Sequence, residues 1–299
     1  MGPRSARTLR VLGGAVLTDA TRDPLTGRDV RVVGHRQDRP NLPSSDCPFC
    51  PGGLEAPDPY TTRWFPNRWP PLPDGRAEVL LYSPEHDASF ATLSTAQARA
   101  VVDLWVERTE ALAARDDVAY VLIFENRGRE VGATIDHPHG QIYAYDYVPP
   151  AAQAELAVGT CPLCADSPEQ LEAARVGSWV VRVPELAAWP FEVLIQPIDH
   201  VADLPSLPDR DGLAEALCRS VRALDTHFDA ATPYMLWVHQ RPCDGGDWPT
   251  AHAHVHLVPI WRARGVARFV AAAEVGSAVY FNPVDPVDAA SVLRDALRA

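Results

Sequence analysis

His137-Pro-His-Gly-Gln141, followed directly by Ile142-Tyr-Ala-Tyr145, is the stretch that decides the fold. Its proline and glycine are poor helix formers, and the residues after it favour an extended strand. Because alternate side chains of a strand point to the same face, His137, His139 and Gln141 are predicted to lie side by side. A neutral imidazole can ligate a metal or attack a phosphorus centre. Two neighbouring imidazoles can divide these two roles between them.

The chain contains this pattern of metal-binding groups twice. The first copy consists of Cys47-Pro-Phe-Cys50, His86 and His137, and the second of Cys161-Pro-Leu-Cys164, His200 and His252. The step from the second cysteine to the first histidine is the same in both, since 86 − 50 and 200 − 164 both give 36. The next step is 51 in one copy (137 − 86) and 52 in the other (252 − 200). A repeat of this length predicts two related α+β units.

The two units are predicted to cover residues 1–150 and 151–299, with Pro149-Pro150 closing the first. Helices are expected at 94–115, where Ser94 to Gln97 form a capping-box pattern, and at 209–228. Residues 151–159 are expected to be a linker or a short helix. Strands are expected near 28–34, 78–82, 119–124, 141–146, 178–183, 192–196, 234–238 and 253–260.

Each copy supplies two cysteines and two histidines, which is the ligand set of a closed tetrahedral zinc site. Disulfides or thioredoxin-like redox pairs would not need histidines at the same distance twice. The chain does not open with a secretory signal pattern, and no apolar run approaches the roughly 20 residues of a membrane span. We therefore expect a cytoplasmic protein with reduced thiols, with zinc at the first site and zinc or another divalent metal at the second.

The composition of the chain limits the class of ligand that it is expected to bind. A chain of 299 residues that is 46% hydrophobic can bury a large core or two fused ones. The net charge of −12 and the pI near 5.2 argue against a nucleic-acid binder. They do not exclude a phosphorylated small molecule, since arginines gather around the first copy and a guanidinium grips phosphate bidentately. These are Arg36, Arg39, Arg63, Arg68, Arg127 and Arg129, most of which, taken singly, are expected to be solvated surface charges.

The motif at 137–141 resembles the active-site motif of the galactose-1-phosphate uridylyltransferases, the transferase branch of the histidine-triad superfamily. The resemblance extends over nearly the whole chain. It includes Pro24-Leu-Thr-Gly27, His35-Arg36-Gln-Asp-Arg39-Pro40, Phe65-Pro-Asn67-Arg68, Ser83-Pro-Glu-His86, Phe124-Glu-Asn126-Arg-Gly128 and Ala188-Trp-Pro-Phe-Glu192. It implies two tandem histidine-triad-like units, each an antiparallel sheet with packed helices, that form one duplicated core. It also implies a homodimer with shared sites.

The resemblance implies a ping-pong transfer of UMP from UDP-glucose, through a uridylyl-histidine, to galactose 1-phosphate. His139 would be the nucleophile and Gln141 a hydrogen-bond donor to a phosphoryl oxygen. Arg36 and Arg39 would bind phosphate, and the further substrate contacts would be Asn67, Arg68, Asn126 and Thr134. His137 cannot be the nucleophile if it ligates zinc, because its lone pair is then occupied. That zinc would be structural and would hold the strand that presents His139.

The second copy reads His252-Ala-His-Val-His256, which resembles the pattern of the histidine-triad hydrolases. Gln141 favours transfer over hydrolysis in the first copy, since glutamine has no titratable proton for water chemistry. The second triad is interpreted as a relic strand whose His252 ligates metal with Cys161, Cys164 and His200; His254 is the alternative fourth ligand. Some relatives instead bind a metal with one Glu and three His. Here that set would be His239, His254 and His256 with Glu169 or Glu172.

The C-terminal segment departs from the family pattern. Where the family usually reads Lys-Phe-x-x-Gly-x-Glu, this chain has Arg268-Phe-Val-Ala-Ala-Ala-Glu274. Glu274 is still predicted to bind sugar hydroxyls across the dimer. The tail at 278–283 is similar to that of the ADP-glucose phosphorylases, which keeps a phosphorylase or a nucleotide hydrolase as alternatives. A non-catalytic zinc and nucleotide-binding protein is a third. Pro138 and Gly140, where phosphorylases tend to carry small polar residues, favour the uridylyltransferase.

Overall fold

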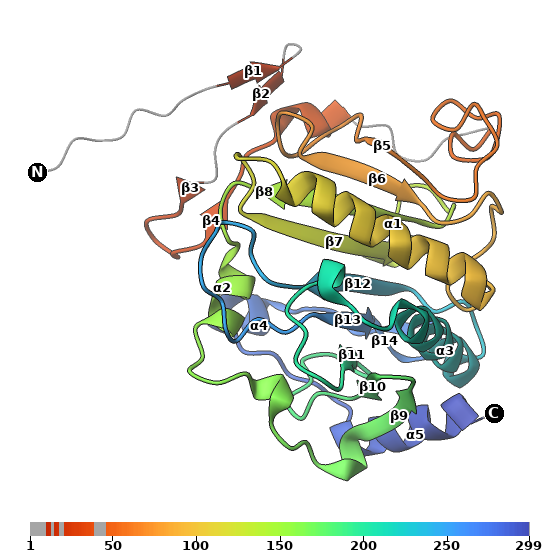
Figure 1. Cartoon of the computed structure of the whole chain (residues 1–299). Coiled ribbons are helices and arrows are strands. Elements are labelled where there is room, and N and C mark those ends of the chain that lie inside the picture. Colours follow the sequence, from red (N-terminus) through yellow and green to blue (C-terminus); the bar gives the residue numbers. More distant parts are fainter. Residues whose placement is uncertain (1–9, 13–14, 18–20, 39–45, 299) are drawn as a thin grey trace, which may run out of the picture.

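The computed structural model describes residues 10–12, 15–17, 21–38 and 46–298, and its central feature is a nine-stranded antiparallel sheet (Figure 1). The strands, in spatial order, are β5 (Arg63–Pro66), β6 (Ala77–Leu81), β8 (His139–Tyr145), β7 (Tyr120–Arg127), β12 (Tyr234–His239), β13 (His254–Pro259), β11 (Val193–Pro197), β10 (Trp179–Arg182) and β9 (Glu172–Val176). The β7–β12 pair joins the two halves of the sequence into one sheet.

The strand order shows the duplication predicted from the sequence. Outward from the β7–β12 seam, β8, β6 and β5 follow on one side, and β13, β11 and β10 follow on the other. These are the strands that the repeat makes equivalent. The two units therefore share one continuous sheet, which confirms a duplicated α+β core. A boundary at residue 150 remains a prediction.

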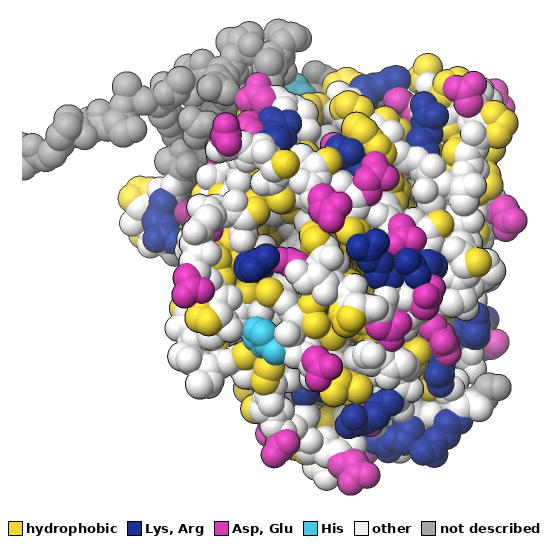
Figure 2. All heavy atoms as spheres, in the orientation of Figure 1, with side chains coloured by type: hydrophobic (Ala, Val, Ile, Leu, Met, Phe, Trp, Pro, Cys, Tyr) yellow, Lys and Arg dark blue, Asp and Glu magenta, His cyan; other side chains and the backbone are white. Residues whose placement is uncertain are grey.

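Helices cover one face of this sheet. α1 (Thr95–Ala113) and α3 (Arg210–Phe228) pack against each other, and α5 (Pro286–Arg298) packs beside α3 and β9 (Figure 1). The helices predicted at 94–115 and 209–228 are thus confirmed, and the Ser94 side chain accepts a hydrogen bond from the backbone N–H of Gln97 as an N-cap. Acidic and arginine side chains are interspersed over this side of the molecule (Figure 2).

Buried and partly exposed residues alternate along the strands, which places the histidines on the face of the sheet that the helices do not cover. In β8, Gly140, Ile142 and Ala144 are buried, whereas His139 and Gln141 are partly exposed. Directly opposed residues of an antiparallel pair share a face. Gln141 is opposite Phe124, Phe124 is opposite Trp237, and Trp237 is opposite His256. Both histidine motifs therefore lie on the face of the sheet turned away from α1 and α3.

The remaining elements are short. They are β1 (Arg10–Leu12), β2 (Ala15–Leu17), β3 (Thr21–Arg22), β4 (Asp29–Val30), α2 (Pro150–Leu156), β14 (Trp261–Ala263), β15 (Val266–Ala267), α4 (Ala272–Ser277) and the 3-10 turns at 34–38, 129–131, 162–164, 169–171 and 204–206. The strand expected at 28–34 is only partly present: Asp29–Val30 form β4, which pairs with β3, and Val33 forms an isolated bridge. Asp29 and Val30 are both exposed, so they offer the large sheet no apolar face. Strands β5 and β9 and helix α5 were not predicted. No helix of the described residues is long and apolar enough to cross a membrane.

Candidate active site

His139 begins strand β8, and its ring is oriented by its own backbone. Nδ1 lies 2.7 Å from the carbonyl oxygen of His137, which places the Nδ1 proton in that hydrogen bond and the lone pair on Nε2. The ring of Phe49 packs against the imidazole edge-on, with the centroids 5.1 Å apart. On the same face, the Oε1 atom of Gln141 accepts a hydrogen bond of 3.1 Å from the Asn67 amide. The imidazole and the amide are therefore held next to each other.

Two cavities meet at His139. One, of about 470 Å³, is lined by Phe65, Asn67, Trp69 and Thr134 as well as by Gln141. The other, of about 370 Å³, is lined by Ser89, Asn126 and Arg127. The first has aromatic walls that suit a planar ring and amides that suit polar substituents. Of the predicted contacts, Asn67, Arg68 and Thr134 line the first cavity and Asn126 the second.

The first set of cysteines and histidines is brought together directly behind His139. Cys47, Cys50, His86 and His137 each offer one ligand atom, and these atoms lie within 4.8 Å of one another. Cys50 Sγ is 3.5 Å from His86 Nδ1 and 3.6 Å from His137 Nδ1. His137 Nε2 donates to the carbonyl oxygen of Ser83 at 2.8 Å, which directs Nδ1 toward the sulfurs. Two thiols and two oriented imidazoles at these distances fit a tetrahedral zinc ion.

The second set repeats this geometry. The ligand atoms of Cys161, Cys164, His200 and His252 again lie within 4.8 Å of one another. Cys164 Sγ is 3.1 Å from His200 Nδ1, and His252 Nε2 lies 3.2 Å from the carbonyl oxygen of Pro197. Burial lowers the pKa of both His137 and His252 to about 4, so that both imidazoles are neutral and ready to ligate. This site is more open than the first, because Cys164 and His200 are exposed.

A third cluster consists of Glu155, His239, His254 and His256, whose ligand atoms also lie within 4.8 Å of one another. Glu155 Oε2 is 2.7 Å from His239 Nδ1 and 3.5 Å from His254 Nε2, and the Nε2 of His256 is buried without a hydrogen-bond partner. The carboxylate is supplied by α2, so the expectation of Glu169 or Glu172 is wrong. His252 and His254 belong to different clusters: the predicted Cys₂His₂ set contains His252, and the three histidines of the alternative set come together with Glu155.

The predicted arginines have different surroundings. Arg36 Nη1 lies 3.4 Å from the hydroxyl of Tyr143, two residues along β8 from Gln141, so its side chain reaches the strand that carries the motif. Arg68 forms an ion pair of 2.7 Å with Glu55 at the first cavity. Arg39 lies outside the described residues.

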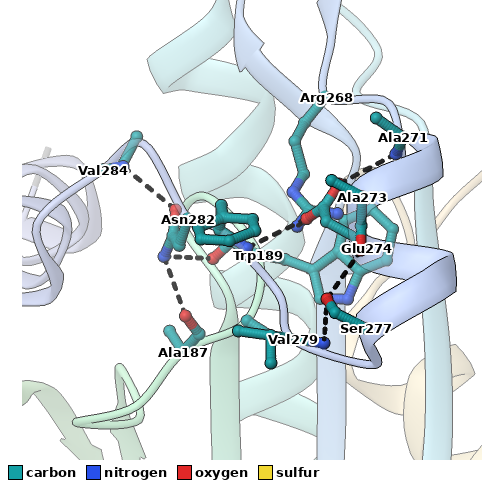
Figure 3. A network of polar contacts seen from close by, with 12 residues as sticks. Ala187, Trp189, Arg268, Ala271, Ala273, Glu274, Ser277, Val279, Asn282 and Val284 are labelled. Atoms are coloured by element: carbon teal, nitrogen blue, oxygen red, sulfur yellow. Dashed lines mark hydrogen bonds and ion pairs between the residues drawn. The ribbon is translucent and has the colours of Figure 1, made fainter.

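Glu274 lies at the start of α4 in a buried network of polar contacts (Figure 3). Its carboxylate accepts from the Arg268 guanidinium and from the backbone N–H groups of Ala271 and Phe281. These hydrogen bonds lower the pKa of Glu274, the backbone ones most. The guanidinium also lies over the Trp189 ring, 4.4 Å from its centroid. Within one chain Glu274 thus orders the C-terminal segment, and its contact with a sugar remains a prediction.

Sequence reasoning missed two residues of these sites. Tyr60 donates to the carbonyl oxygen of Phe49 at 2.7 Å and lies 2.9 Å from His137 Nε2, which ties the cysteine loop to the histidine strand. Glu155 completes the third cluster. Neither had a motif or a repeated spacing to identify it, although an acidic residue in the Ala-rich stretch before Cys161 was a weak signal for Glu155.

Comparisons with known proteins agree with this geometry. Residues 70–149 match the family model of the galactose-1-phosphate uridyl transferase N-terminal domain, and residues 164–279 match that of the C-terminal domain. The chain is 34% identical to a galactose-1-phosphate uridylyltransferase of Thermotoga maritima over 91% of this chain and 96% of that protein. It is 37% identical to that of Streptomyces lividans over 80% and 75% of the two chains.

Solved structures show the same fold. A uridylyltransferase structure aligns with a TM-score of 0.84 and 30% identity, covering 93% of this chain and 98% of that one. An ADP-glucose phosphorylase from Arabidopsis thaliana with bound ADP-glucose aligns with a TM-score of 0.75 and 25% identity over the same shares. The likeness of sequence extends through both halves, and the paired histidines, the adjoining amides and the duplicated sheet occur together. The chain therefore belongs to the galactose-1-phosphate uridylyltransferase family, a family of nucleotidyltransferases.

Proposed function

We propose that this chain transfers UMP from UDP-glucose to galactose 1-phosphate through a covalent intermediate on His139. In the first step, Nε2 forms a bond to the α-phosphorus while the bond to the bridging oxygen breaks and glucose 1-phosphate leaves. In the second, a phosphate oxygen of galactose 1-phosphate attacks the same phosphorus, and Nε2 departs with UDP-galactose formed. Each step exchanges one bond to phosphorus for another of similar energy, which makes the reaction readily reversible.

The observation that carries this proposal is the hydrogen bond between His139 Nδ1 and the carbonyl oxygen of His137. With the proton fixed on Nδ1, the lone pair that can attack phosphorus is on Nε2. When Nε2 is bonded to phosphorus the ring becomes cationic, and the carbonyl dipole stabilises that charge without reorganising. The imidazole is thereby prepared as a nucleophile without a separate base.

The cavity that contains Gln141 is proposed to bind the nucleoside. Phe65 and Trp69 supply aromatic surface for the base, and Asn67 supplies an amide near the phosphoryl end. The Asn67 amide donates to Gln141 Oε1, which leaves the Gln141 N–H groups directed elsewhere. We assign these N–H groups to a phosphoryl oxygen, because phosphoryl transfer depends mostly on positioning and on compensation of charge. Arg36 would contribute a cationic contact.

Zinc is proposed at both Cys₂His₂ sets, where it would supply no chemistry beyond holding the ligand residues in place. In the first half, His137 is two residues from His139, so fixing His137 fixes the start of β8. The Glu155 cluster offers an oxygen and three imidazole nitrogens, a donor set suited to a divalent metal of intermediate hardness. Cytoplasmic location is part of the same proposal, since thiolates must stay reduced to bind metal.

A homodimer is proposed as the active form, with the segment around Glu274 of each copy completing the other's sugar site. Apolar side chains are exposed together in this segment: Phe269, Val275, Val279, Tyr280 and Phe281. A dimer would bury them. Mixing His139→Ala with Glu274→Ala chains tests this, because shared sites would restore about a quarter of wild-type activity in a statistical mixture of dimers, whereas separate sites would restore none.

The direct test is to incubate the protein with UDP-glucose alone and to record the intact mass and the released glucose 1-phosphate. One UMP per chain is expected, lost in His139→Ala and discharged by galactose 1-phosphate. The sequence contains no lysine, so an acid-labile phosphoramidate can be assigned to histidine by peptide mapping without a competing lysine adduct. A wild-type protein, loaded with zinc, that forms no adduct contradicts the proposal.

A second candidate is phosphorolysis of ADP-glucose, favoured by the similarity to the Arabidopsis thaliana phosphorylase over 93% of this chain. It uses the same nucleophile with a different base and acceptor. The parallel incubation with ADP-glucose distinguishes the two, since an AMP adduct discharged by inorganic phosphate would identify the phosphorylase.

A further inference from the structure

Glu125 is a buried carboxyl group directly behind the nucleophile strand. It lies in the middle of β7, opposite Gly140 in the β7–β8 ladder. Gly140 is the residue between His139 and Gln141, and a side chain at its position would point toward the helices. Glu125 points the same way, and only 4% of its surface is exposed. The carboxyl group of Glu125 plays no part in the proposed displacement. It nevertheless lies in the buried layer that supports the strand of His139 and Gln141.

The surroundings of this carboxyl group disfavour its charge. Oε1 accepts a 2.8 Å hydrogen bond from the Tyr234 hydroxyl, and Oε2 is buried without a hydrogen-bond partner. Arg127 is bound to both carboxylate oxygens of Asp225 at 3.1 Å. An ionised carboxylate with no cation bound to it is costly in the interior. Burial accordingly raises the pKa of Glu125 to about 7, although the Tyr234 hydrogen bond and the Arg127 charge act in the other direction.

Tyr82 connects this group to the active-site strand. Its backbone N–H donates to the carbonyl oxygen of Pro138 at 3.1 Å, and its side chain is 1% exposed. The hydroxyl packs so closely beneath Gly140 that a Cβ there would overlap it. Burial, and next the charge of Glu125, raise the pKa of Tyr82. Tyr234, Glu125 and Tyr82 thus form a buried polar group on the reverse side of the strand that carries His139 and Gln141.

The second half of the molecule lacks this group. In its ladder, the pair opposite each other behind His254 and His256 is Val238 and Val255. The corresponding pair behind His139 and Gln141 is Glu125 and Gly140. At this equivalent position, the half that contains His139 has a glutamate opposite a glycine, and the half that contains the Glu155 cluster has two valines opposite each other. A polar interior is unnecessary for forming the strand, because the second half forms it without one.

We propose that Glu125 is a positioning residue for His139, acting as a neutral carboxylic acid that, with Tyr234 and Tyr82, supports Gly140 from behind. Ionisation would place an uncompensated charge in the core, and the structure would respond by moving Tyr82 and the strand above it. Transfer to His139 is then fastest when Glu125 is protonated, and it slows as Glu125 loses its proton.

The groups that face Glu125 allow this titration to be isolated. They are Tyr234 from β12, Arg127 from β7 with Asp225 of α3, Tyr82 from the segment after β6, and Asp87, Glu130, Asp136, His137 and His139 around the cavity it borders. Burial holds the pKa of Tyr82 and Tyr234 well above their ordinary value. Replacement of Glu125 alone therefore identifies the contribution of that carboxyl group to a pH profile.

The test compares wild type with Glu125→Gln, which keeps the size and the acceptor for Tyr234 but cannot ionise. Glu110→Gln, at an exposed position of α1, is the matched control. The single-turnover rate of His139 uridylylation is measured across the neutral range. Wild type and control should lose rate about 25-fold from pH 6.5 to pH 8.5, as a single group that titrates near 7 requires. Glu125→Gln should match them within about threefold at low pH and keep its rate at high pH.

Two further measurements need no substrate, which separates this inference from the proposed function on which its kinetic part rests. The infrared band of a protonated carboxyl group should titrate near pH 7 in wild type and be absent from Glu125→Gln. The Gly140 amide resonance, in ¹⁵N-glycine protein, should move with the same midpoint only in wild type. Tyr234→Phe should shift that midpoint upward, since it removes a hydrogen bond that favours the charged form.

Two results would overturn the inference. One is a Glu125→Gln enzyme with the wild-type pH profile, and the other is a Gly140 resonance that stays fixed across the titration. A uniform loss of rate at every pH, with reduced zinc content, would show a structural role only and would also overturn it. If wild type formed no adduct at all, the proposed function would fail, while the infrared and Gly140 titrations would still decide the role of Glu125.

Discussion

The two halves of the sheet present the same histidine in the same way and surround it differently. His139 Nδ1 lies 2.7 Å from the carbonyl oxygen of His137, and His254 Nδ1 lies 2.7 Å from that of His252. In both halves the residue that supplies this carbonyl belongs to a Cys₂His₂ set. The strand and the adjoining Cys₂His₂ set thus hold an imidazole in the same way in both halves, and they do not by themselves determine what that imidazole does.

The two halves differ in the residues that lie beside this histidine on the same face of the sheet. Gln141 occupies the strand position of His256, and continuing the ladder past Glu125 and Gly140 gives Asn126 the position of His239. One half has two amides beside its imidazole, and the other has two further imidazoles and the carboxylate of Glu155. Amides donate hydrogen bonds without titrating, which suits a phosphoryl group. Imidazoles with a carboxylate suit a metal ion, which would occupy the lone pair that a nucleophile needs.

Replacement of the two imidazoles should give the largest contrast. His139→Ala is expected to lower the rate of UMP transfer on the order of 10⁴-fold or more, since the covalent route is lost. His254→Ala is expected to keep adduct formation on His139 and to lose metal from the third cluster. Adduct mass and metal content, measured on the same samples, check both statements. Formation of a UMP adduct on His254 would contradict the division of roles between the halves.

The buried acid of the first half should make stability depend on pH in a way that the second half does not. The pKa of Glu125 is raised by burial to about 7 in the folded protein from its ordinary value of 4.5, so the folded state holds this proton more tightly. Its stabilising contribution is complete below pH 4.5 and is lost as pH rises through 7, by about 3 kcal/mol in all. Urea unfolding should therefore find Glu125→Gln close to wild type at acid pH and more stable than wild type at pH 8.

A replacement at Val238, the corresponding position of the second half, provides the comparison. Val238→Thr introduces a buried hydroxyl without a titratable proton, so it should lower stability equally at all pH values. If Glu125→Gln also changed the free energy of unfolding equally at pH 5 and pH 8, the carboxyl group would not titrate between folded and unfolded states as argued.

The two zinc sets should differ in their effect on catalysis. Cys50→Ser removes a ligand next to His137, which is 2% exposed and two residues from the nucleophile, and should lower the transfer rate about 10- to 100-fold. Cys164→Ser alters the exposed second set and should leave the rate within about threefold, since it acts far along the sheet from β8. Each variant should lose one equivalent of zinc. Equal losses of rate would show that the halves are coupled through the shared sheet.

The parts of the molecule that could be predicted from the sequence are those whose residues recur at regular spacings. Spacing identified the eight cysteines and histidines that are proposed as ligands, and the structure brings each set of four together. Periodicity identified α1, α3 and the strands that bear the histidines. These features depend on local pattern and on the duplication, and both can be read along the chain.

The parts that could not be predicted depend on contacts between distant segments. Glu155 is 84 positions from His239, and an acidic residue in an Ala-rich stretch is only a weak signal that α2 folds over the second histidine motif. Glu125 was within a recognised motif, but its buried position places it against Tyr234, which is 109 positions away. The strand expected at 28–34 is limited to Asp29–Val30, because its partner β3 is two residues long and neither Asp29 nor Val30 has a covered face.

Gly140 offers the smallest and most local contrast between the halves. Val255 occupies the same strand position beside His254, so the strand itself accepts a side chain there. At Gly140 a Cβ would overlap the Tyr82 hydroxyl and come within 3.2 Å of the Phe124 carbonyl oxygen. Gly140→Ala should therefore destabilise the protein by about 1–3 kcal/mol through overpacking. Removal of the hydroxyl in Tyr82→Phe should recover part of this loss in the double variant, which a double-mutant cycle of unfolding free energies would measure as coupling. Strictly additive effects would mean that the restriction comes from Phe124 and the backbone, and that the buried tyrosine does not set the position of the nucleophile strand.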